Sequence, residues 1–258
     1  MRLERERVAV VTGGASGIGL GLAEAAARQG MRLLLVDLDE EGLEQAAARV
    51  RETGSRVETV VADVSDAGAV ERVADRAFAA GSVQLVCSNA GVVVHGNAWQ
   101  ISAADWERVL GVDLMGTVHV IRAFVPGLLQ AHRPARLLVT GSMQSVTARA
   151  GISPYVAAKH GLLGLCESLH HDLAAVHAPI GVTLMMPGLV GTAMSAEMRP
   201  ESISPAEAAK IAFAAIEGDR LFAFTHRDRI PEVERRFAAI LGDGVLPGAV
   251  DPASPTYS

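Results

Sequence analysis

Short apolar runs alternate with longer helical patterns through most of the chain. Six such runs lie near residues 7–11, 31–36, 56–61, 83–87, 135–140 and 180–185. Segments of ten or more residues with helical periodicity separate them. Apolar strands that each lead into a helix are typical of a parallel sheet covered on both faces. The pattern predicts an α/β fold with a doubly wound parallel sheet in three αβα layers.

The alternation continues toward the C-terminus without a break in composition. A helix is expected over 205–217, with Ser204 as its cap and proline at its first position, and residues 221–225 read as a seventh strand. We therefore expect a single domain over residues 1–242. Residues 243–258 lack periodicity and are expected to be a flexible tail or an arm on a neighbouring subunit.

Composition and charge exclude several classes of function. The net charge is -6, and no basic run with interleaved aromatic residues is present, which argues against a nucleic-acid partner. No apolar run approaches the roughly 20 residues of a membrane span, and the N-terminus has no apolar stretch of signal-peptide length. We expect a soluble, cytoplasmic protein without a membrane partner. Cys87 and Cys166 read as buried reduced thiols, and neither they nor His170 and His171 have metal-ligand spacing.

A glycine-rich turn follows the first strand. Its sequence, Thr12-Gly13-Gly14-Ala15-Ser16-Gly17-Ile18-Gly19, leads directly into a helical pattern. A helix N-terminus after such a turn presents unpaired N–H groups and a positive dipole end to a pyrophosphate. Such a turn can also be purely structural, and its G-x-x-x-G-x-G spacing differs from the common G-x-G-x-x-G fingerprint.

The residue that ends the second strand supports the dinucleotide interpretation. Asp37 lies about 20 residues beyond the turn, where a carboxylate accepts hydrogen bonds from an adenosine ribose. A 2'-phosphate would meet a like charge there, and Leu38 stands where a basic residue would be needed. We expect NAD rather than NADP as the cofactor.

Tyr155 and Lys159 stand four residues apart and so share one face of a helix. The spacing alone is equally compatible with an ordinary helix surface. Hydride transfer to a ketone builds negative charge on its oxygen, so an enzyme needs a proton donor and a second fixed donor there. The Tyr155 phenol suits the first role, and the Lys159 ammonium favours its phenolate form.

Five separated motifs, in one order, resemble the short-chain dehydrogenase/reductase family. The resemblance runs from about Val8 to Thr192, with further likeness to about Gly242. The motifs are the turn Thr12 to Gly19, Asp63-Val64, Asn89-Ala90-Gly91, Ser142 with Tyr155 and Lys159, and Pro187-Gly188-Leu189-Val190-Gly191-Thr192. The resemblance implies a Rossmann fold and an NAD(P)-dependent oxidoreductase acting on CH–OH groups.

The resemblance also implies a role for each motif. Asp63 and Val64 would contact the adenine, Asn89 to Gly91 would support the central strand, and Pro187 to Thr192 would hold the nicotinamide end. Ser142, Tyr155 and Lys159 would be catalytic. Ser142 is preferred over Ser145 as the second donor, because its spacing from Tyr155 matches the family.

One motif departs from the family. The chain reads Val112-Asp113-Leu114-Met115-Gly116 where the family usually has V-N-x-x-G, with an asparagine that holds a water beside the catalytic lysine. We include Asp113 in the catalytic set. A carboxylate there would raise the pKa of Lys159 and oppose phenolate formation, since an ionised carboxylate only accepts hydrogen bonds. The alternative is that Asp113 only bonds backbone in its helix.

Two classes of function remain open at this stage. The first is hydride transfer between NAD(H) and a secondary alcohol or ketone, with a hydrophobic substrate favoured by Met194, Met198 and other apolar candidates for the pocket walls, namely Trp99, Met143, Ile152 and Leu189. The second is a nucleotide-sensing or regulatory protein with weak or no turnover. Relatives that use the same triad for epimerisation or dehydration resemble a longer branch with a separate substrate domain.

Two long apolar helices are expected over 103–130 and 154–176. Both carry more apolar and small residues than one buried stripe requires, and relatives pair these helices between subunits. We expect a homo-oligomer, a tetramer or a dimer.

Overall fold

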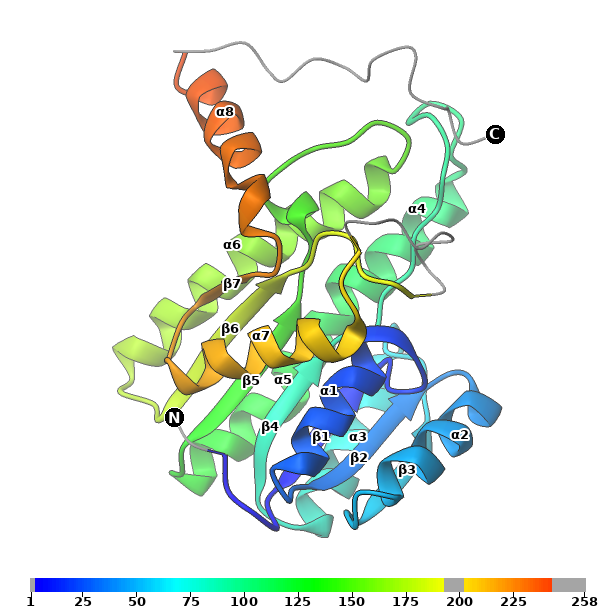
Figure 1. Cartoon of the computed structure of the whole chain (residues 1–258), viewed down its shortest axis with the longest axis vertical. Coiled ribbons are helices and arrows are strands. Elements are labelled where there is room, and N and C mark those ends of the chain that lie inside the picture. The colour runs from blue at the N-terminus through cyan, green and yellow to red at the C-terminus, as the bar shows by residue number, and fades with distance from the viewer. Residues whose placement is uncertain (1–2, 193–201, 243–258) are drawn as a thin grey trace.

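The computed structural model describes residues 3–192 and 202–242, which form one seven-stranded parallel sheet (Figure 1). The strand order is β3-β2-β1-β4-β5-β6-β7. The strands are β1 (Val8–Thr12), β2 (Arg32–Asp37), β3 (Val57–Val61), β4 (Val83–Ser88), β5 (Ala135–Thr140), β6 (Ile180–Met186) and β7 (Phe222–Phe224). The doubly wound parallel sheet expected from the sequence is confirmed, including the seventh strand.

Helices cover both faces of the sheet and bury two apolar layers. On one face lie α1 (Gly17–Arg28), α2 (Glu40–Arg51) and α7 (Pro205–Glu217), and on the other α3 (Ala67–Ala80), α5 (Gly116–Ala131) and α6 (Ser153–Ala175). Figure 1 shows α1 and α7 crossing in front of the strands. The strand interiors are buried on both faces, which explains their continuous apolar sequences.

The strand order reverses between β1 and β4, and this positions the functional edge. The chain winds outward from β1 to β3, then returns to place β4 on the other side of β1. All strands are parallel, so their carboxyl ends lie along one edge. A crevice outside the carboxyl ends at such a reversal is where open α/β sheets bind ligands.

The long helix expected over 103–130 is interrupted by a π-helical turn. It divides into α4 (Ala103–Leu110), the π turn η1 (Gly111–Met115) and α5. The N–H of Gly116 donates to the carbonyl of Gly111, five residues back. A Cβ on Gly116 would come within 2.8 Å of Val64 Cγ2, so glycine lets this turn approach the loop after β3. Hydrophobic periodicity alone could not predict the π turn, because a π turn inserts a single residue and barely disturbs the helical pattern.

The combined helix Ala103–Ala131 is long and apolar enough to cross a membrane by length and composition. The expectation that no apolar run approaches that length was wrong for this helix, because polar residues interrupt its apolar sequence. The helix packs on the sheet through Val120, Phe124 and Leu128, which are fully buried, and it holds the buried carboxylate of Asp113. It therefore has the character of a core helix.

The helix α8 (Ile230–Ile240) was not expected from the sequence. Figure 1 shows it rising away from the sheet at the end of the described chain. Val233 packs against the core below, whereas Phe237 and Ile240 are exposed. Proline at the second position and apolar residues at helical spacing were the available signals. The tail 243–258, Met194 and Met198 lie outside the described residues.

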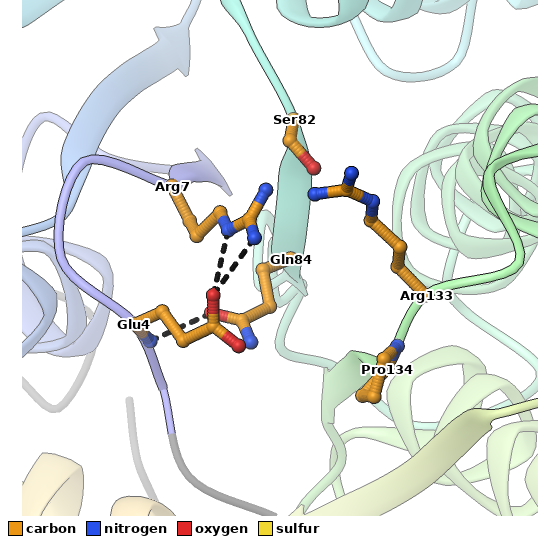
Figure 2. Close-up of a pocket in the computed structure, with 6 residues that line it drawn as sticks. All are labelled: Glu4, Arg7, Ser82, Gln84, Arg133 and Pro134. Carbon is orange, nitrogen blue, oxygen red and sulfur yellow. Dashed lines mark hydrogen bonds and ion pairs between the residues drawn. The ribbon is translucent and has the colours of Figure 1, made fainter.

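A cavity of about 200 Å³ lies at the opposite edge of the sheet. Figure 2 shows its lining residues, which are Glu4, Arg7, Ser82, Gln84, Arg133 and Pro134. Ser82 directly precedes β4 and Pro134 directly precedes β5, so the cavity is at the amino ends of the strands. Arg7 forms an ion pair with Glu4 at 2.8 Å, and the Glu4 N–H donates to Gln84 Oε1. This cavity is separate from the carboxyl edge where the sequence motifs gather.

Candidate active site

The glycine turn has a backbone that favours glycine at two positions. Gly13 and Gly17 have φ angles of 65° and 52°, in the left-handed region. A Cβ on Gly13 would lie 2.9 Å from Ala90 Cα, and one on Gly19 would lie 1.9 Å from the Gly13 carbonyl oxygen. The turn is therefore packed tightly against the loop after β4.

The N-terminus of α1 fits the pyrophosphate of a dinucleotide. Ser16 is the N-cap of α1, with extended backbone and no side-chain cap hydrogen bond. Its side chain is exposed, and Ile18 is half-buried. The N–H groups of the first helical turn are thus left for an anion, which the positive end of the helix dipole attracts. A Cβ at Gly13, Gly17 or Gly19 would come within 3.0 Å of neighbouring protein atoms, so this tight turn requires glycine at these positions.

Asp37 ends β2 beside this turn. Its Oδ2 accepts a hydrogen bond from the Ala15 N–H at 3.1 Å, and its Oδ1 accepts one from the Leu38 N–H at 2.8 Å. The turn therefore orients the carboxylate, which is half-buried at the carboxyl edge. Leu38 is 61% exposed and offers no positive charge to a 2'-phosphate.

The loop after β3 carries the pair expected at the adenine. Asp63 Oδ1 accepts hydrogen bonds from the N–H and the hydroxyl of Ser65, at 2.8 and 2.7 Å. Val64 is buried, and its carbonyl lies 2.9 Å from His119 Nδ1 on α5. These contacts hold Asp63 and Val64 at the same edge as Asp37.

A chain of hydrogen bonds joins the glycine turn to the Tyr-Lys helix. Thr12 Oγ1 accepts from the N–H groups of Asn89 and Ala90, and Asn89 Nδ2 donates to the carbonyls of Thr12 and Gly13. Asn89 Oδ1 accepts from the Thr140 hydroxyl at 3.0 Å. The Thr140 carbonyl accepts from Lys159 Nζ at 3.1 Å. We define these bonds, with the ion pair below, as the edge network.

Lys159 and Asp113 form a buried ion pair. Lys159 is 3% exposed, Asp113 is 1% exposed, and Nζ lies 3.1 Å from Oδ2. Oδ1 accepts a hydrogen bond from the Val92 N–H at 2.7 Å. A Cβ on Gly91 would lie 3.2 Å from Oδ2, so the glycine makes room for the carboxylate. Asp113 therefore contacts both backbone and Lys159, the two possibilities that the sequence left open.

The ion pair changes the proton affinities of both partners. Burial opposes the charged form of Lys159, but the negative charges of Asp113 and Tyr155 outweigh it and raise the pKa of the ammonium above its usual value. Burial raises the pKa of Asp113, and the positive charge of Lys159 opposes that shift. We take Lys159 as charged, because its ammonium donates to the Thr140 carbonyl, pairs with Asp113 and lies over the Tyr155 ring.

Tyr155 lies directly beside this pair on α6. The Lys159 ammonium is 5.2 Å from the centroid of the Tyr155 ring, and the tyrosine is partly exposed, whereas the lysine is buried. The four-residue spacing thus places both head groups on one side of the helix, as predicted. A partly exposed phenol can reach a substrate while its charged neighbour stays shielded from water.

The two serines after β5 have different environments. Ser142 is half-buried, and its hydroxyl accepts a hydrogen bond from the Gln144 N–H at 3.1 Å. Its own hydrogen can then be donated to a ligand. Ser145 is fully buried, and its hydroxyl accepts from the Ser142 N–H at 3.2 Å. Ser145 therefore supports the loop, and Ser142 remains the candidate donor.

The segment Pro187–Thr192 follows β6 at the same edge. Pro187 accepts a hydrogen bond from the Met143 N–H, and the Gly188 N–H lies within reach of Thr225 Oγ1 and His226 Nδ1, at 3.1 and 3.2 Å. Val190 is buried and bridges to Ile203. A Cβ on Gly17 would lie 3.0 Å from Thr192 Cγ2, so the end of this segment contacts the glycine turn.

Several residues of the site were missed from the sequence. Thr12, Thr140 and His226 hold neighbouring loops together, and Gln144 lies beside Ser142. Thr12 and Thr140 each end a strand, and a hydroxyl at a carboxyl strand end could have indicated their roles.

The remaining candidates have different surroundings. Cys87 and Cys166 are buried, and burial raises the pKa of both thiols. Trp99 is 82% exposed. No group of three metal-binding side chains occurs within residues 3–192 and 202–242.

Comparisons with known proteins identify the family. A model of the short chain dehydrogenase family matches residues 7–203. The 1-deoxy-11-beta-hydroxypentalenate dehydrogenase of Streptomyces avermitilis is 39% identical over 230 residues, covering 85% of this chain and 84% of that protein. The CLA biosynthesis dehydrogenase/reductase of Lactiplantibacillus plantarum is 28% identical, covering 93% and 95%.

Solved structures agree with the sequence comparisons. A short chain dehydrogenase/reductase from Burkholderia phymatum, solved in complex with NAD, superimposes with a TM-score of 0.91 at 31% identity. The match covers 99% of this chain and all of the other. The family model spans the glycine turn, the edge network and the Tyr155 helix. The chain belongs to the short-chain dehydrogenase/reductase family of oxidoreductases.

Proposed function

We propose that this protein transfers a hydride between NAD(H) and the carbinol carbon of a secondary alcohol or ketone, with a predominantly hydrophobic substrate. The observation that carries the proposal is the buried Lys159 ammonium, 5.2 Å from the Tyr155 ring and bonded to the β5 end that leads to Ser142. Proton transfer and oxyanion stabilisation can thus converge on one oxygen beside a dinucleotide cradle.

Each catalytic side chain has one task. In alcohol oxidation the Tyr155 phenolate oxygen takes the hydroxyl proton of the substrate while the carbon loses a hydride. Ser142 donates its hydroxyl hydrogen to the same substrate oxygen and stabilises its negative charge. The Lys159 ammonium stabilises the phenolate electrostatically. In ketone reduction the same proton moves from Tyr155 to the carbonyl oxygen.

Asp113 opposes the effect of Lys159. Its carboxylate holds the ammonium through a 3.1 Å ion pair, and it also adds a negative charge near the phenol. Ionised Asp113 therefore disfavours the phenolate, relative to the uncharged asparagine usual in the family. We include Asp113 in the catalytic machinery as a positioning residue that acts through Lys159.

NAD is the proposed cofactor, in preference to NADP. When bound, the nicotinamide supplies the hydride acceptor and donor chemistry. The residues that would hold the dinucleotide are Gly13, Ser16, Gly17, Ile18, Gly19, Asp37, Leu38, Asp63, Val64, Asn89, Ala90, Gly91, Tyr155, Lys159, Pro187, Gly188, Val190 and Thr192. Asp37 supports NAD, because its oriented carboxylate would repel a 2'-phosphate.

A hydrophobic substrate is supported by the name of one relative and by the apolar candidates for the pocket walls. The name of the Streptomyces avermitilis relative indicates a hydroxypentalenate substrate for that enzyme. Met143 and Ile152 are buried and Leu189 is half-buried in this chain.

The cytoplasmic location and the single domain over residues 1–242 remain predictions.

The alternative function is a nucleotide sensor or regulator with weak or no turnover. The complete Ser142, Tyr155 and Lys159 set disfavours it, because a sensor needs no proton donor at a substrate oxygen. NADH absorbance measured with a panel of secondary alcohols and ketones distinguishes the dehydrogenase from the sensor. Turnover supports the dehydrogenase, whereas cofactor binding without turnover of any panel member supports the sensor.

The acid/base assignment predicts different effects of two substitutions. Tyr155→Phe should abolish turnover while NADH binding stays within a few-fold, because the ring remains and only the hydroxyl is lost. Lys159→Ala should weaken both turnover and binding and should destabilise the fold, since Asp113 would be left as a buried unpaired charge. Initial rates and NADH fluorescence titrations measure these effects. Substantial activity in Tyr155→Phe would show that another group transfers the proton.

The cofactor proposal predicts NAD(H) binding tighter than NADP(H) by at least about tenfold, or about 1.4 kcal/mol. Asp37→Ser combined with Leu38→Arg should move the preference toward NADP(H), because the like charge is removed and a positive charge is added. Asp39→Ser is the matched control: it removes a neighbouring carboxylate, while a serine can still cap α2 through the Gly42 N–H, so the cofactor preference should not change. Tighter binding of NADPH by the unmodified enzyme would refute this assignment.

The role of Asp113 predicts a shift in the pH dependence of alcohol oxidation. Asp113→Asn removes the carboxylate charge near the phenol. Below the pH at which Lys159 loses its proton, the phenolate is then easier to form, so the rate should reach half its maximum at lower pH, with turnover preserved or improved. The measurement is kcat against pH for both proteins, with a melting curve to show that the variant is folded. An unchanged profile in a folded variant would show that Asp113 has only a structural role.

We propose a homotetramer or dimer that pairs α5 and α6 between subunits. Met115 is 44% exposed, and further apolar residues on these helices are only partly covered in one chain, namely Val118, Ile121, Val125, Leu163 and Leu165. Light scattering at micromolar concentration should give about two or four times the mass of one chain. Leu165→Glu should dissociate the assembly, whereas Phe237→Glu on α8 should not. A monomeric unmodified protein would overturn the prediction.

A further inference from the structure

Gln144 presents a buried polar atom that the proposed mechanism does not use. The residue is 9% exposed, and its side-chain Oε1 has no hydrogen-bond partner among the described residues. A buried amide oxygen without a partner lowers stability, because its hydration is lost and not replaced. Such a group in a folded protein therefore needs a function or a ligand to explain it.

The position of Gln144 ties this atom to the catalytic loop. Gln144 belongs to the 3₁₀ turn Met143–Ser145, which begins directly after Ser142 and packs against α6. Its backbone N–H donates to the Ser142 hydroxyl at 3.1 Å. The same residue thus orients the oxyanion donor through its main chain and also carries the unpaired side-chain acceptor.

Neighbouring side chains in the turn are accounted for in other ways. Met143 is 1% exposed, and Ser145 uses its hydroxyl to accept from the Ser142 N–H. The hydroxyl of Thr147 donates to the Met143 carbonyl at 2.8 Å. Among the side chains of this loop, the Gln144 amide carries the buried acceptor for which the described residues supply no partner.

We propose that Gln144 determines substrate specificity by accepting a hydrogen bond from a second hydroxyl on the substrate, near the reacting carbinol. The substrate class is then a largely apolar secondary alcohol that carries one further hydroxyl group. This inference rests on the proposed dehydrogenase function and specifies its substrate. A site built to bond a hydroxyl discriminates strongly against an analogue that lacks it, because the protein acceptor is then left unpaired.

The test compares matched alcohols in the unmodified enzyme and in Gln144→Met, which has similar length and no acceptor of comparable strength. The probes are cyclohexanol with its 1,2-, 1,3- and 1,4-diols, and 1-phenylethanol with 1-phenyl-1,2-ethanediol. The unmodified enzyme should prefer at least one diol by about tenfold or more in kcat/KM. In Gln144→Met the ratio of kcat/KM between that diol and its mono-alcohol should fall to about one, because both alcohols then meet a side chain without a strong acceptor.

Thr147→Val is the matched control, since it removes a satisfied hydroxyl from the same loop. It should lower the melting temperature and leave the diol preference unchanged, whereas Gln144→Met should keep or raise the melting temperature. If Gln144→Met lowers the melting temperature as Thr147→Val does and leaves the preference intact, Gln144 holds only a structural water and the inference is wrong. Absence of any diol preference in the unmodified enzyme also overturns it.

Failure of the proposed dehydrogenase function can be distinguished from failure of the Gln144 assignment. If none of these alcohols is oxidised, the dehydrogenase proposal fails for them, and the inference is judged by calorimetric titration of the same probes into the NADH complex. Tighter binding of a diol than of its mono-alcohol, lost in Gln144→Met, supports the Gln144 assignment without turnover. Equal binding of the two alcohols contradicts it.

Discussion

The ion pair between Lys159 and Asp113 is the constraint on which the proposed site depends, because it fixes a charge in a place without water. Both side chains are almost fully buried, and an isolated charge there would be strongly disfavoured. Three other elements meet at the pair: the end of β5 through the Thr140 carbonyl, the loop after β4 through the Val92 N–H, and the π turn that carries Asp113. Removing one partner of such a pair typically costs about 3–5 kcal/mol.

The edge network extends this constraint to the cofactor cradle. Asn89 bonds the Thr12 and Gly13 carbonyls and the Thr140 hydroxyl, so the glycine turn and the strand that supports Lys159 are held by one amide. The spacing between the proposed pyrophosphate site and the proposed proton donor is therefore set by hydrogen bonds between adjacent strand ends. Sheet order explains why this is possible: β1, β4 and β5 are neighbours, although far apart in the sequence.

Much of the fold could be predicted because its signals are local. Apolar runs gave all seven strands to within a residue or two, and Ser204 with Pro205 marked the start of α7. The Gly-rich turn, Asp37, Tyr155 and Lys159 were found because strand ends and helical spacing restrict where such side chains can lie. The contact between Asp113 and Lys159 could not be resolved, since it depends on a π turn whose formation requires close packing of Gly116 on Val64. The unpaired acceptor of Gln144 could not be predicted, because its burial depends on tertiary packing and the sequence pattern does not indicate it.

The central claim is that Asp113 holds Lys159 in its charged form, and the sequence allows a direct measurement. The chain has two lysines, Lys159 and Lys210, so labelling with lysine carrying ¹³C at the ε-carbon gives two signals to follow by NMR through a pH titration. Lys210→Arg assigns them. The account predicts that Lys159 loses its proton at higher pH than Lys210, and that Asp113→Asn lowers the titration midpoint of Lys159 while leaving Lys210 unchanged. A Lys159 signal that titrates with Lys210 in both proteins would contradict the account.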